Sequence, residues 1–238
     1  MTDRGFQIAI DGPVAAGKGT VSRAVADKLG FLYVDTGATY RVVALMAIEN
    51  GVNLDRLDQF DQDEVNKLVE LLKTNKIGLK KVGTENDGRL LTVLLNERDV
   101  TWRIREADVN LLVPVVAKIP QVRDELVRVQ REIAGSENVV MEGRDVAYRV
   151  LPEAGLKIYL DADVKIRARR KLDEVLAKAE DKSFEMMLKE VERRDELDST
   201  REVDPLKKID EAWYLDTTQL KVSEVVELIV AKVNTIRT

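Results

Sequence analysis

Residues 6–35 decide the fold, and they read FQIAIDGPVAAGKGTVSRAVADKLGFLYVD. Phe6–Asp11 is a nearly continuous apolar run, which is typical of a strand buried on both faces. Gly30 then marks the end of a predicted helix whose apolar residues recur at helical spacing, namely Val21, Ala24, Val25 and Leu29. Phe31–Val34 predicts a second short strand. A strand, a glycine-rich turn, a helix and a second strand in this order form a βαβ unit.

The glycine-rich turn carries the P-loop pattern Gly-x-x-x-x-Gly-Lys at Gly12, Gly17 and Lys18. Glycines let the backbone curl so that successive N–H groups point at phosphate oxygens, and the following helix adds the positive end of its dipole. Lys18 would place a point charge at the β- and γ-phosphates. We therefore predict that a nucleotide's phosphates bind to the consecutive residues Gly12, Pro13, Val14, Ala15, Ala16, Gly17, Lys18, Gly19 and Thr20.

Gly19 follows the lysine, where a P-loop usually carries a Ser or Thr that ligates Mg²⁺. We expect Mg²⁺ to be held by the nucleotide phosphates, by water and by acidic residues elsewhere, and we assign no metal ligand. Asn75-Lys76-Ile77 is followed by Gly78, so the guanine-recognition pattern Asn-Lys-x-Asp is missing there. The loop is therefore unlike that of a GTPase.

Further short strands are predicted at Val139–Glu142, Leu156–Leu160 and Trp213–Leu215, each followed by a turn and a helical pattern. The last predicted helix runs from Val222 to about Ile236, with one apolar face formed by Val222, Val225, Val226 and Ile229. Alternating strands and helices predict an α/β fold with a parallel sheet and helices on both faces.

The middle of the chain looks like an insertion between the second and third core strands. After Asp35-Thr36-Gly37, which predicts a turn, helical patterns lie at Thr39 to about Glu49, near Asp61–Leu72 and at about Gln121–Ile133. A hairpin is predicted with arms Ile77–Val82 and Leu90–Leu95 around the turn at residues 84–88. Residues 163–201 are predicted to be helical and are rich in Arg, Lys and Glu.

Composition excludes several kinds of chemistry. The 238 residues contain no Cys and no His, so thiol nucleophiles, zinc ribbons, Ser–His–Asp triads and imidazole acid–base catalysis are absent. The 38 Lys and Arg against 43 Asp and Glu give a net charge of −5, which argues against general nucleic-acid binding. The N-terminal residues have no apolar signal region, and no stretch is long and apolar enough for a membrane span. We expect a cytoplasmic protein that binds neither membrane nor nucleic acid.

Charged residues in other segments are further candidates, each with a plainer reading. Arg144 and Asp145 follow the third core strand, where ligands gather in open α/β sheets, although they could be a salt-bridged loop pair. A continuous helix would put Arg194, Asp198 and Arg201 on one face, as a site or as a surface ion-pair ladder. Two more candidates, Arg167 and Arg170, lie one turn apart and could equally form a basic solvated face.

Residues 8–41, together with later motifs in matching order, closely resemble the bacterial cytidylate kinase family. Gly17-Lys18-Gly19-Thr20 is shared by nucleoside monophosphate kinases, and the run from Asp35 to Arg41 (DTGATYR) is more specific. The later matches are Asp99-Val100-Thr101, Ile104-Arg105, Pro120-x-Val122-Arg123, Gln130-Arg131, Glu142-Gly143-Arg144-Asp145, Pro152-x-Ala154, Lys157-Ile158-Tyr159-Leu160, Arg167-Ala168-x-Arg170, Arg194-Asp195-x-x-Asp198-Ser199-Thr200-Arg201, Pro205-Leu206 and Asp216-Thr217-Thr218. The resemblance covers essentially the whole chain.

The resemblance implies phosphorylation of CMP and dCMP by ATP with Mg²⁺, in a monomeric protein. It implies an adenylate-kinase-like P-loop fold with a five-stranded parallel sheet. Within a single kinase domain, the core would be residues 1–35, 139–162 and 202–238. The NMP-binding region with its insert would be residues 36–138, and the short lid with its adjoining helices residues 163–201.

The resemblance also implies a role for each candidate residue. Thr36 and Arg41, beside Asp35, would contact the acceptor's α-phosphate, with a helix cap and a surface arginine as the plainer reading. Arg123 and Asp145 would contact cytosine, and Asp198 the ribose hydroxyls. Arg144 would lie near the acceptor phosphate, while Arg194 and Arg201 would contact phosphates and base. The lid residues Arg167 and Arg170 would close over ATP. The predicted catalytic set is Lys18, Arg41, Arg144, Arg167, Arg170 and Arg194.

The chain departs from the family pattern at a few positions. Pro114 stands where the family commonly has a Ser whose hydroxyl touches the base, Leu197 where it often has Arg, and Val146-Ala147-Tyr148 where Ile-Gly-Thr is frequent. We expect weaker discrimination of CMP from UMP than in relatives with the serine. Two alternatives remain at this point: another P-loop kinase of a small acceptor, and a nucleotide-binding module without turnover.

Overall fold

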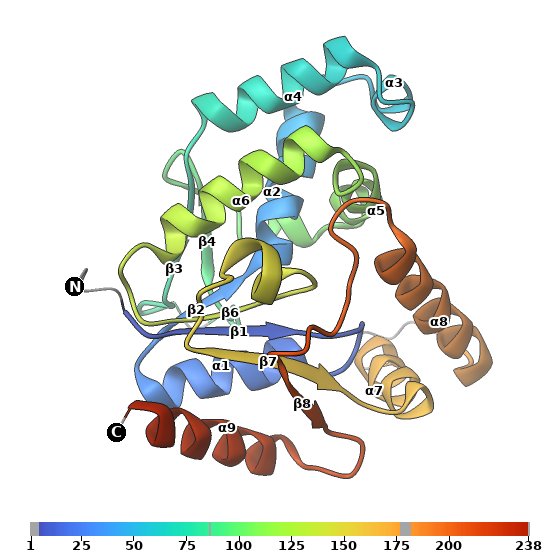
Figure 1. Cartoon of the computed structure of the whole chain (residues 1–238). Coiled ribbons are helices and arrows are strands. Elements are labelled where there is room, and N and C mark those ends of the chain that lie inside the picture. Colours follow the sequence, from blue (N-terminus) through green and yellow to red (C-terminus); the bar gives the residue numbers. More distant parts are fainter. Residues whose placement is uncertain (1–4, 86, 177–181, 238) are drawn as a thin grey trace. The chain divides into compact units, whose positions relative to one another are not determined.

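The structure is a computed structural model of the 238-residue chain, and it describes residues 5–85, 87–176 and 182–237. It divides into two compact units (Figure 1). The first unit contains Leu32–Glu137, and the second contains Gly5–Phe31 and Asn138–Thr238. Among the described residues, no helix combines the length and the apolar character that crossing a membrane would require.

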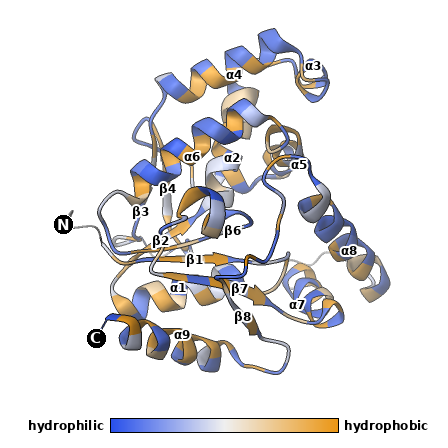
Figure 2. Ribbon diagram, in the orientation of Figure 1, coloured by the Kyte–Doolittle hydropathy of each residue, from blue (hydrophilic) through white to orange (hydrophobic). Residues whose placement is uncertain are grey.

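The second unit carries the P-loop between a central strand and a helix. Its elements are β1 (Gln7–Asp11), α1 (Lys18–Leu29), β6 (Val139–Gly143), the π-helix η2 (Val146–Val150), β7 (Leu156–Asp161), α7 (Val164–Leu176), α8 (Phe184–Thr200), β8 (Trp213–Asp216) and α9 (Val222–Arg237). All five residues of β1 are buried, because this strand lies between β6 and β7 and is covered on its faces. Figure 2 shows the apolar character of β1 and β7, and Figure 1 shows α1 and α9 side by side below these strands.

The larger sheet has the strand order β2-β6-β1-β7-β8, where β2 is Leu32–Asp35. β1 pairs in parallel with β6, with Asp11 opposite Gly143, and β7 pairs in parallel with β1 and β8. This confirms the predicted α/β fold with a five-stranded parallel sheet. Since parallel strands end at the same edge, the segments that follow β1, β6, β7 and β8 leave the sheet together.

The first unit is built mainly of helices and a small antiparallel sheet. Besides β2, its elements are α2 (Thr36–Glu49), α3 (Leu54–Asp58), α4 (Gln62–Thr74), β3 (Ile77–Lys80), β4 (Thr92–Leu95), β5 (Arg98–Asp99), the 3-10 helix η1 (Arg103–Arg105), α5 (Ala107–Val116) and α6 (Pro120–Ala134). The predicted hairpin is present, with Ile77 opposite Leu95, although its arms are shorter than expected. One residue of the predicted turn, Asn86, lies outside the described residues.

Several predicted boundaries are wrong. No turn precedes α2, because Asp35 is extended (ψ 105°) as its N-cap residue and the helix begins at Thr36. The apolar face of α9 does not include Val222, whose exposed fraction is 46%, whereas Val225 and Ile229 are buried. The helical stretch 163–201 is split into α7 and α8, and its residues 177–181 lie outside the described part.

Helix α5 was not predicted, because it contains Pro114. Proline has no N–H for the hydrogen bond to the residue four positions earlier, so it weakens a helical pattern in the sequence. The other residues of α5 are mostly apolar, and packing against α2 supplies the stabilisation that local propensity lacks.

Gly12 directly follows β1, and its backbone leaves no room for a side chain. Its φ is +155°, and an added Cβ would overlap the carbonyl oxygen of Leu160 in the neighbouring strand β7. We expect Gly12→Ala to lower the free energy of unfolding by about 3 kcal/mol, because β1 and β7 must separate locally. Gly30→Ala is the matched control, since Gly30 also has a positive φ (+71°) but its added Cβ meets nothing within 4 Å. That change should cost about 1 kcal/mol; equal losses for both variants in denaturant unfolding would contradict the steric argument.

Candidate active site

The first residues of the P-loop hold the side chain of its lysine, Lys18. Lys18 is the first residue of α1, and Gly17 before it is left-handed with φ 92°. Ala15 is also left-handed (φ 58°), so the loop alternates conformations in the way that turns successive N–H groups toward an anion. The buried Lys18 ammonium donates to the carbonyl oxygens of Gly12 (2.8 Å) and Pro13 (2.7 Å). The positive charge therefore lies where the loop begins.

Lys18 lies near a second cation, Arg144. Burial, and after it the positive charge of Arg144, lower the pKa of the Lys18 ammonium to about 7, while Glu142, Asp198 and Asp11 oppose this shift. Arg144 is thus close enough to Lys18 to act on its charge, so two cationic side chains stand near the loop together with these carboxylates. A phosphate group bound there would be attracted by both side chains.

Asp11 links the end of β1 to the segment after β6. Its carboxylate accepts from the backbone N–H groups of Val146 (3.0 Å) and Ala147 (2.8 Å). Burial raises the pKa of Asp11 to about 6, partly offset by these hydrogen bonds. Asp11 thereby fixes the start of η2, directly after Arg144 and Asp145. The sequence interpretation did not select Asp11 as a functional residue, although its position just before Gly12 was visible.

Arg144 and Asp198 form the centre of an ion-pair cluster. Arg144 Nε lies 2.7 Å from Asp198 Oδ2, and Arg194 Nε lies 3.3 Å from Asp198 Oδ1. Burial opposes ionisation of Asp198, but Arg144, Arg194 and Arg201 outweigh it and hold the pKa of the carboxyl below its usual value. The pKa of Arg144 is likewise raised despite its burial, chiefly by Asp198. The cluster is thus centred on the buried Asp198 carboxylate with partly exposed arginines around it, and the plainer reading of a solvated surface ladder is wrong for Asp198.

Arg201 reaches this region without being part of the helix. α8 ends at Thr200, and Arg201 is extended with ψ 143°. Its Nη2 lies 3.7 Å from Asp145 Oδ1, and its Nε donates to the carbonyl oxygen of Asp204 (2.7 Å). The predicted i, i+4, i+7 helical face therefore holds for Arg194 and Asp198 only, and the turn toward Asp204 directs Arg201.

The two arginines of α7 are attached to the P-loop rather than solvated. Arg167 Nη1 donates to the carbonyl oxygen of Val14 (3.1 Å) and to Asp195 Oδ2 (2.6 Å). Arg170 Nη1 lies 3.4 Å from the carbonyl oxygen of Ala16, and its Nη2 donates to the carbonyl oxygen of Thr217 (2.9 Å). A basic solvated face is therefore the wrong reading of these residues.

Asp195 and Thr217 were missed as partners of the two α7 arginines. Both belong to motifs that the sequence shows, but their contacts join segments far apart in the chain.

In the first unit, the candidate residues form two local arrangements. Arg41 on α2 has its Nη1 3.4 Å from Asp35 Oδ2, and its Nε donates to Oδ1 of Asn110 on α5 (3.2 Å). Thr36 is the first residue of α2 and is buried, so it is not the N-cap that the plainer reading assumed.

Arg123 on α6 is fully buried and lies over the ring of Tyr40, 5.4 Å from its centroid. One guanidinium nitrogen donates to the carbonyl oxygen of Ala117 (3.2 Å). A solvated helix position, the usual place for such an arginine, is thereby excluded. A cation held at this depth is a specific recognition group or a structural one.

No group of three or more acidic side chains that could hold a metal ion occurs in residues 5–85, 87–176 and 182–237. The carboxylates that act on Lys18 are those of Asp11, Glu142 and Asp198.

Comparison with known proteins places the whole chain in one family. A family model described as cytidylate kinase matches residues 8–235. A cytidylate kinase of Carboxydothermus hydrogenoformans is 45% identical over 221 residues, which span 93% of this chain and 94% of that protein. A cytidylate kinase of Bacillus cereus is 44% identical over 232 residues, spanning 98% of this chain and 97% of its own.

A solved structure of a protein from Eubacterium ventriosum matches 98% of this chain and 99% of its own, with 12% identity and a TM-score of 0.50. This likeness concerns the fold alone. The family match and the two relatives show that the chain belongs to the cytidylate kinase family.

Proposed function

We propose that this protein transfers the γ-phosphoryl group of ATP to CMP or dCMP, giving ADP and CDP or dCDP. The observation that carries the proposal is the buried Lys18 ammonium at the mouth of a P-loop, with Arg144 close enough to lower its pKa. The attacking group is a phosphate oxygen of the acceptor, which is anionic at neutral pH. The chain therefore needs cations and alignment rather than a histidine base.

ATP, the phosphoryl donor, would bind through the P-loop, Gly12–Thr20. Arg167 and Arg170 already donate to carbonyl oxygens of this loop, so they are placed to follow the phosphates. Mg²⁺ would accompany ATP and neutralise charge on the β- and γ-phosphates. Since Gly19 offers no hydroxyl and no acidic group of three is present among the described residues, phosphates and water would supply most of its ligands.

The acceptor roles follow from the family motifs and the chemistry of cytosine. Arg123 can donate to the ring acceptors N3 and O2, while Asp145 can accept from the exocyclic amine. Asp198 would accept from the ribose hydroxyls. The acceptor phosphate would be bound by Thr36 beside Asp35 and by the arginines Arg41, Arg144, Arg194 and Arg201. We further propose that the protein works as a monomer in the cytoplasm.

A coupled kinase assay with ATP and each of CMP, dCMP, UMP, AMP and GMP tests this function. CMP and dCMP should give the highest kcat/KM. Equal turnover of all these acceptors would refute the cytidylate assignment, and no turnover of any would refute the kinase assignment.

Pro114 should weaken the discrimination of CMP from UMP. It lies inside α5 and offers neither a hydroxyl nor an N–H to a base. We expect Pro114→Ser to raise the CMP/UMP ratio of kcat/KM by about tenfold, because a hydroxyl can pair with a polar edge of cytosine. Pro114→Ala is the control, since it removes the proline without adding a hydroxyl. An unchanged ratio in the serine variant, or the same gain in the alanine variant, would contradict this role.

Binding of ATP should be coupled to proton uptake. Lys18 in the nucleotide-free protein has a pKa of about 7, and phosphates nearby would raise it again. At pH 8 Lys18 is mostly neutral before binding, so we expect an uptake of up to about one proton, and less at pH 6, where it is already charged. Calorimetric titration in buffers of different ionisation enthalpy measures this number. Lys18→Met should abolish the uptake at pH 8, and an equal uptake in this variant would assign it to another group.

A further inference from the structure

The Asp195 carboxylate contacts the P-loop and Arg167 as an anionic ligand would. This residue lies on α8, and its Oδ1 accepts from the backbone N–H of Val14 (3.3 Å). Its other oxygen, Oδ2, accepts from the Arg167 guanidinium (2.6 Å). One loop N–H and one arginine are the kinds of donor that P-loop proteins offer to phosphate oxygens.

The position of Val14 in the loop indicates which phosphate is concerned. Val14 directly follows Gly12 and Pro13, whose carbonyl oxygens accept from the Lys18 ammonium. The lysine of this motif reaches the β- and γ-phosphates rather than the α-phosphate. The loop N–H groups in general face the α- and β-phosphates, but the N–H of Val14 lies next to the two carbonyl groups that hold the lysine, so we assign this N–H to the terminal phosphate of a triphosphate.

We propose that, in the absence of nucleotide, the Asp195 carboxylate occupies the position of the terminal phosphate of a nucleoside triphosphate. When the triphosphate binds, its terminal phosphate replaces Asp195 as the acceptor for the Val14 N–H and the Arg167 guanidinium. That this nucleoside triphosphate is the phosphoryl donor ATP rests on the proposed function. Two anions cannot share these donors without strong repulsion, so the third phosphate and the Asp195 carboxylate exclude each other. A diphosphate, which lacks the third phosphate, leaves Asp195 in place.

Arg167 is held so that it can pass from one anion to the other. Its Nη1 donates to the carbonyl oxygen of Val14, and its Nε to that of Ala162 (2.9 Å). These bonds keep the guanidinium at the loop when the carboxylate leaves. Asp195 is thus a positioning residue, because it keeps Arg167 paired with a carboxylate at the loop. It also makes the environment of α8 depend on whether the third phosphate is bound.

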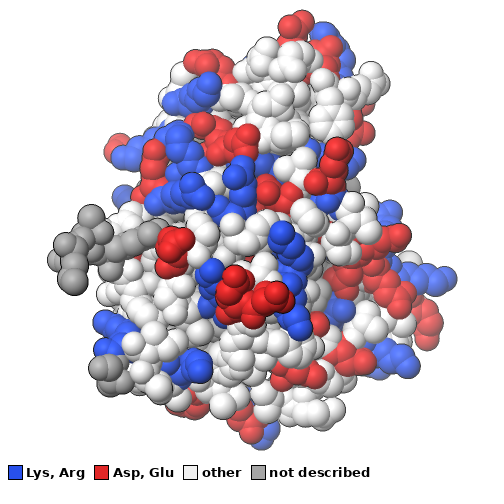
Figure 3. Space-filling model, in the orientation of Figure 1, with Lys and Arg blue, Asp and Glu red and all other residues white. Residues whose placement is uncertain are grey.

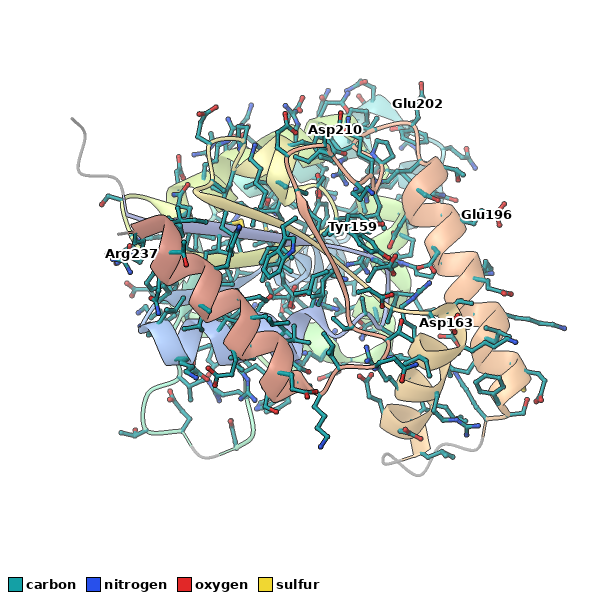
Figure 4. All side chains as sticks on the ribbon, turned by 60° about the horizontal axis from the view of Figure 1, so that its bottom comes forward. Tyr159, Asp163, Glu196, Glu202, Asp210 and Arg237 are labelled. Carbon is teal, nitrogen blue, oxygen red and sulfur yellow. The ribbon has the colours of Figure 1, made fainter. Side chains whose placement is uncertain are left out.

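Equilibrium binding of ATP and ADP, each with Mg²⁺ and without acceptor, tests the proposal. Asp195→Asn keeps the shape but removes the charge, so we expect the Kd for ATP to fall by about fivefold and that for ADP to change by less than about twofold. Asp195→Glu, which retains the charge, should keep the ATP/ADP ratio near that of the native chain. Glu196→Gln is the matched control, because Glu196 is an exposed neighbour on α8, labelled in Figure 4, and should leave both constants unchanged.

Equal shifts for ATP and ADP in Asp195→Asn, or no shift, would overturn the proposal. A second measurement uses the native chain, so it does not depend on the folding of any variant. Hydrogen exchange of residues 184–200 should be faster with a non-hydrolysable ATP analogue than with ADP, and equal exchange would also overturn it. Both readouts omit the acceptor, so failure of the CMP assignment in the kinase assay would leave them interpretable.

Discussion

Lys18→Met should lower kcat for CMP phosphorylation by about 10³-fold, the loss typical of removing a charged group aimed at the transferred phosphate. The ammonium is buried and held by the carbonyl oxygens of Gly12 and Pro13, so water cannot easily replace it. No other lysine is part of the loop. The KM for ATP should also rise, because the same charge acts on the bound donor.

The same change should not lower stability. Burial disfavours the charged form of Lys18, whose pKa falls to about 7 in the folded protein from an ordinary value near 10.5. As pH falls from about 10 to about 7, the unfolded chain takes up this proton before the folded chain does, and the native protein loses stability that the Met variant keeps. Thermal unfolding without nucleotide therefore should give Lys18→Met a Tm at pH 7 no lower than that of the native chain.

Lys28→Met is the matched control for Lys18→Met. Lys28 is also on α1, but it is exposed and pairs with Glu227 at the surface. Its replacement should leave kcat within about twofold, since surface ion pairs contribute little. A Lys18→Met enzyme that retained more than about a tenth of the native kcat would show that the loop lysine is not the main charge acting on the phosphate.

Local signals predicted the segments whose structure depends on neighbouring residues. β1, the P-loop and α1 follow one another within a short stretch, and the stop at Gly30 is confirmed by its left-handed φ of 71°. The turn before α2 was wrong, because Thr36 and Gly37 look like turn residues, whereas the helix is fixed by burial of most of its length. Sequence propensity is overridden there by packing.

Charged residues were harder to place, because their surroundings come from distant segments. Asp195 contacts Val14, which is 181 positions away, and Asp11 contacts Val146, 135 positions away. Arg123 follows Val122 in a helix whose other buried positions are mostly apolar, and this was the one available signal for its burial.

Net charge gives a poor picture of the site. The chain is acidic overall, and the face in Figure 3 carries Lys, Arg, Asp and Glu intermixed. Lys18, Arg123 and Arg167 are buried, so these three cations of the proposed site contribute little to the outer surface. A sum of charges over the whole chain therefore cannot reveal where cations gather inside the fold.

Asp198→Asn should lower kcat/KM for CMP by about 10²-fold or more while leaving the Kd for ATP within about threefold. The Asp198 carboxylate pairs with Arg144 Nε at 2.7 Å and with Arg194 Nε at 3.3 Å, so its charge fixes where both guanidinium groups lie. The amide has the same shape but cannot compensate two cations, and its NH₂ group would oppose one of them. The arginines should then lose the alignment proposed for the acceptor phosphate.

The loss of this charge should also appear as a loss of stability with a defined pH dependence. Breaking a buried ion pair by removing one charge costs about 3 kcal/mol, and the pKa of Asp198 is lowered in the folded protein. Its contribution is present above the unfolded pKa of about 3.9 and disappears as pH falls through the lower folded pKa. The difference in unfolding free energy between native and Asp198→Asn proteins should therefore be constant from pH 7 to about 5 and shrink below about pH 4.

Glu196→Gln removes the same charge from an exposed position of α8 and should change neither activity nor stability measurably. Denaturant unfolding across this pH range, together with CMP kinetics, separates the possible roles of Asp198. A stability loss without a kinetic loss would make Asp198 a purely structural partner of Arg144. A rise in the Kd for ATP as large as the loss in kcat/KM for CMP would show that the ion-pair cluster also acts on the bound ATP. A loss in kcat/KM for CMP at an unchanged Kd for ATP, together with the shrinking stability difference in acid, fits a carboxylate that acts on the acceptor, by aligning the arginines and by accepting from the ribose hydroxyls.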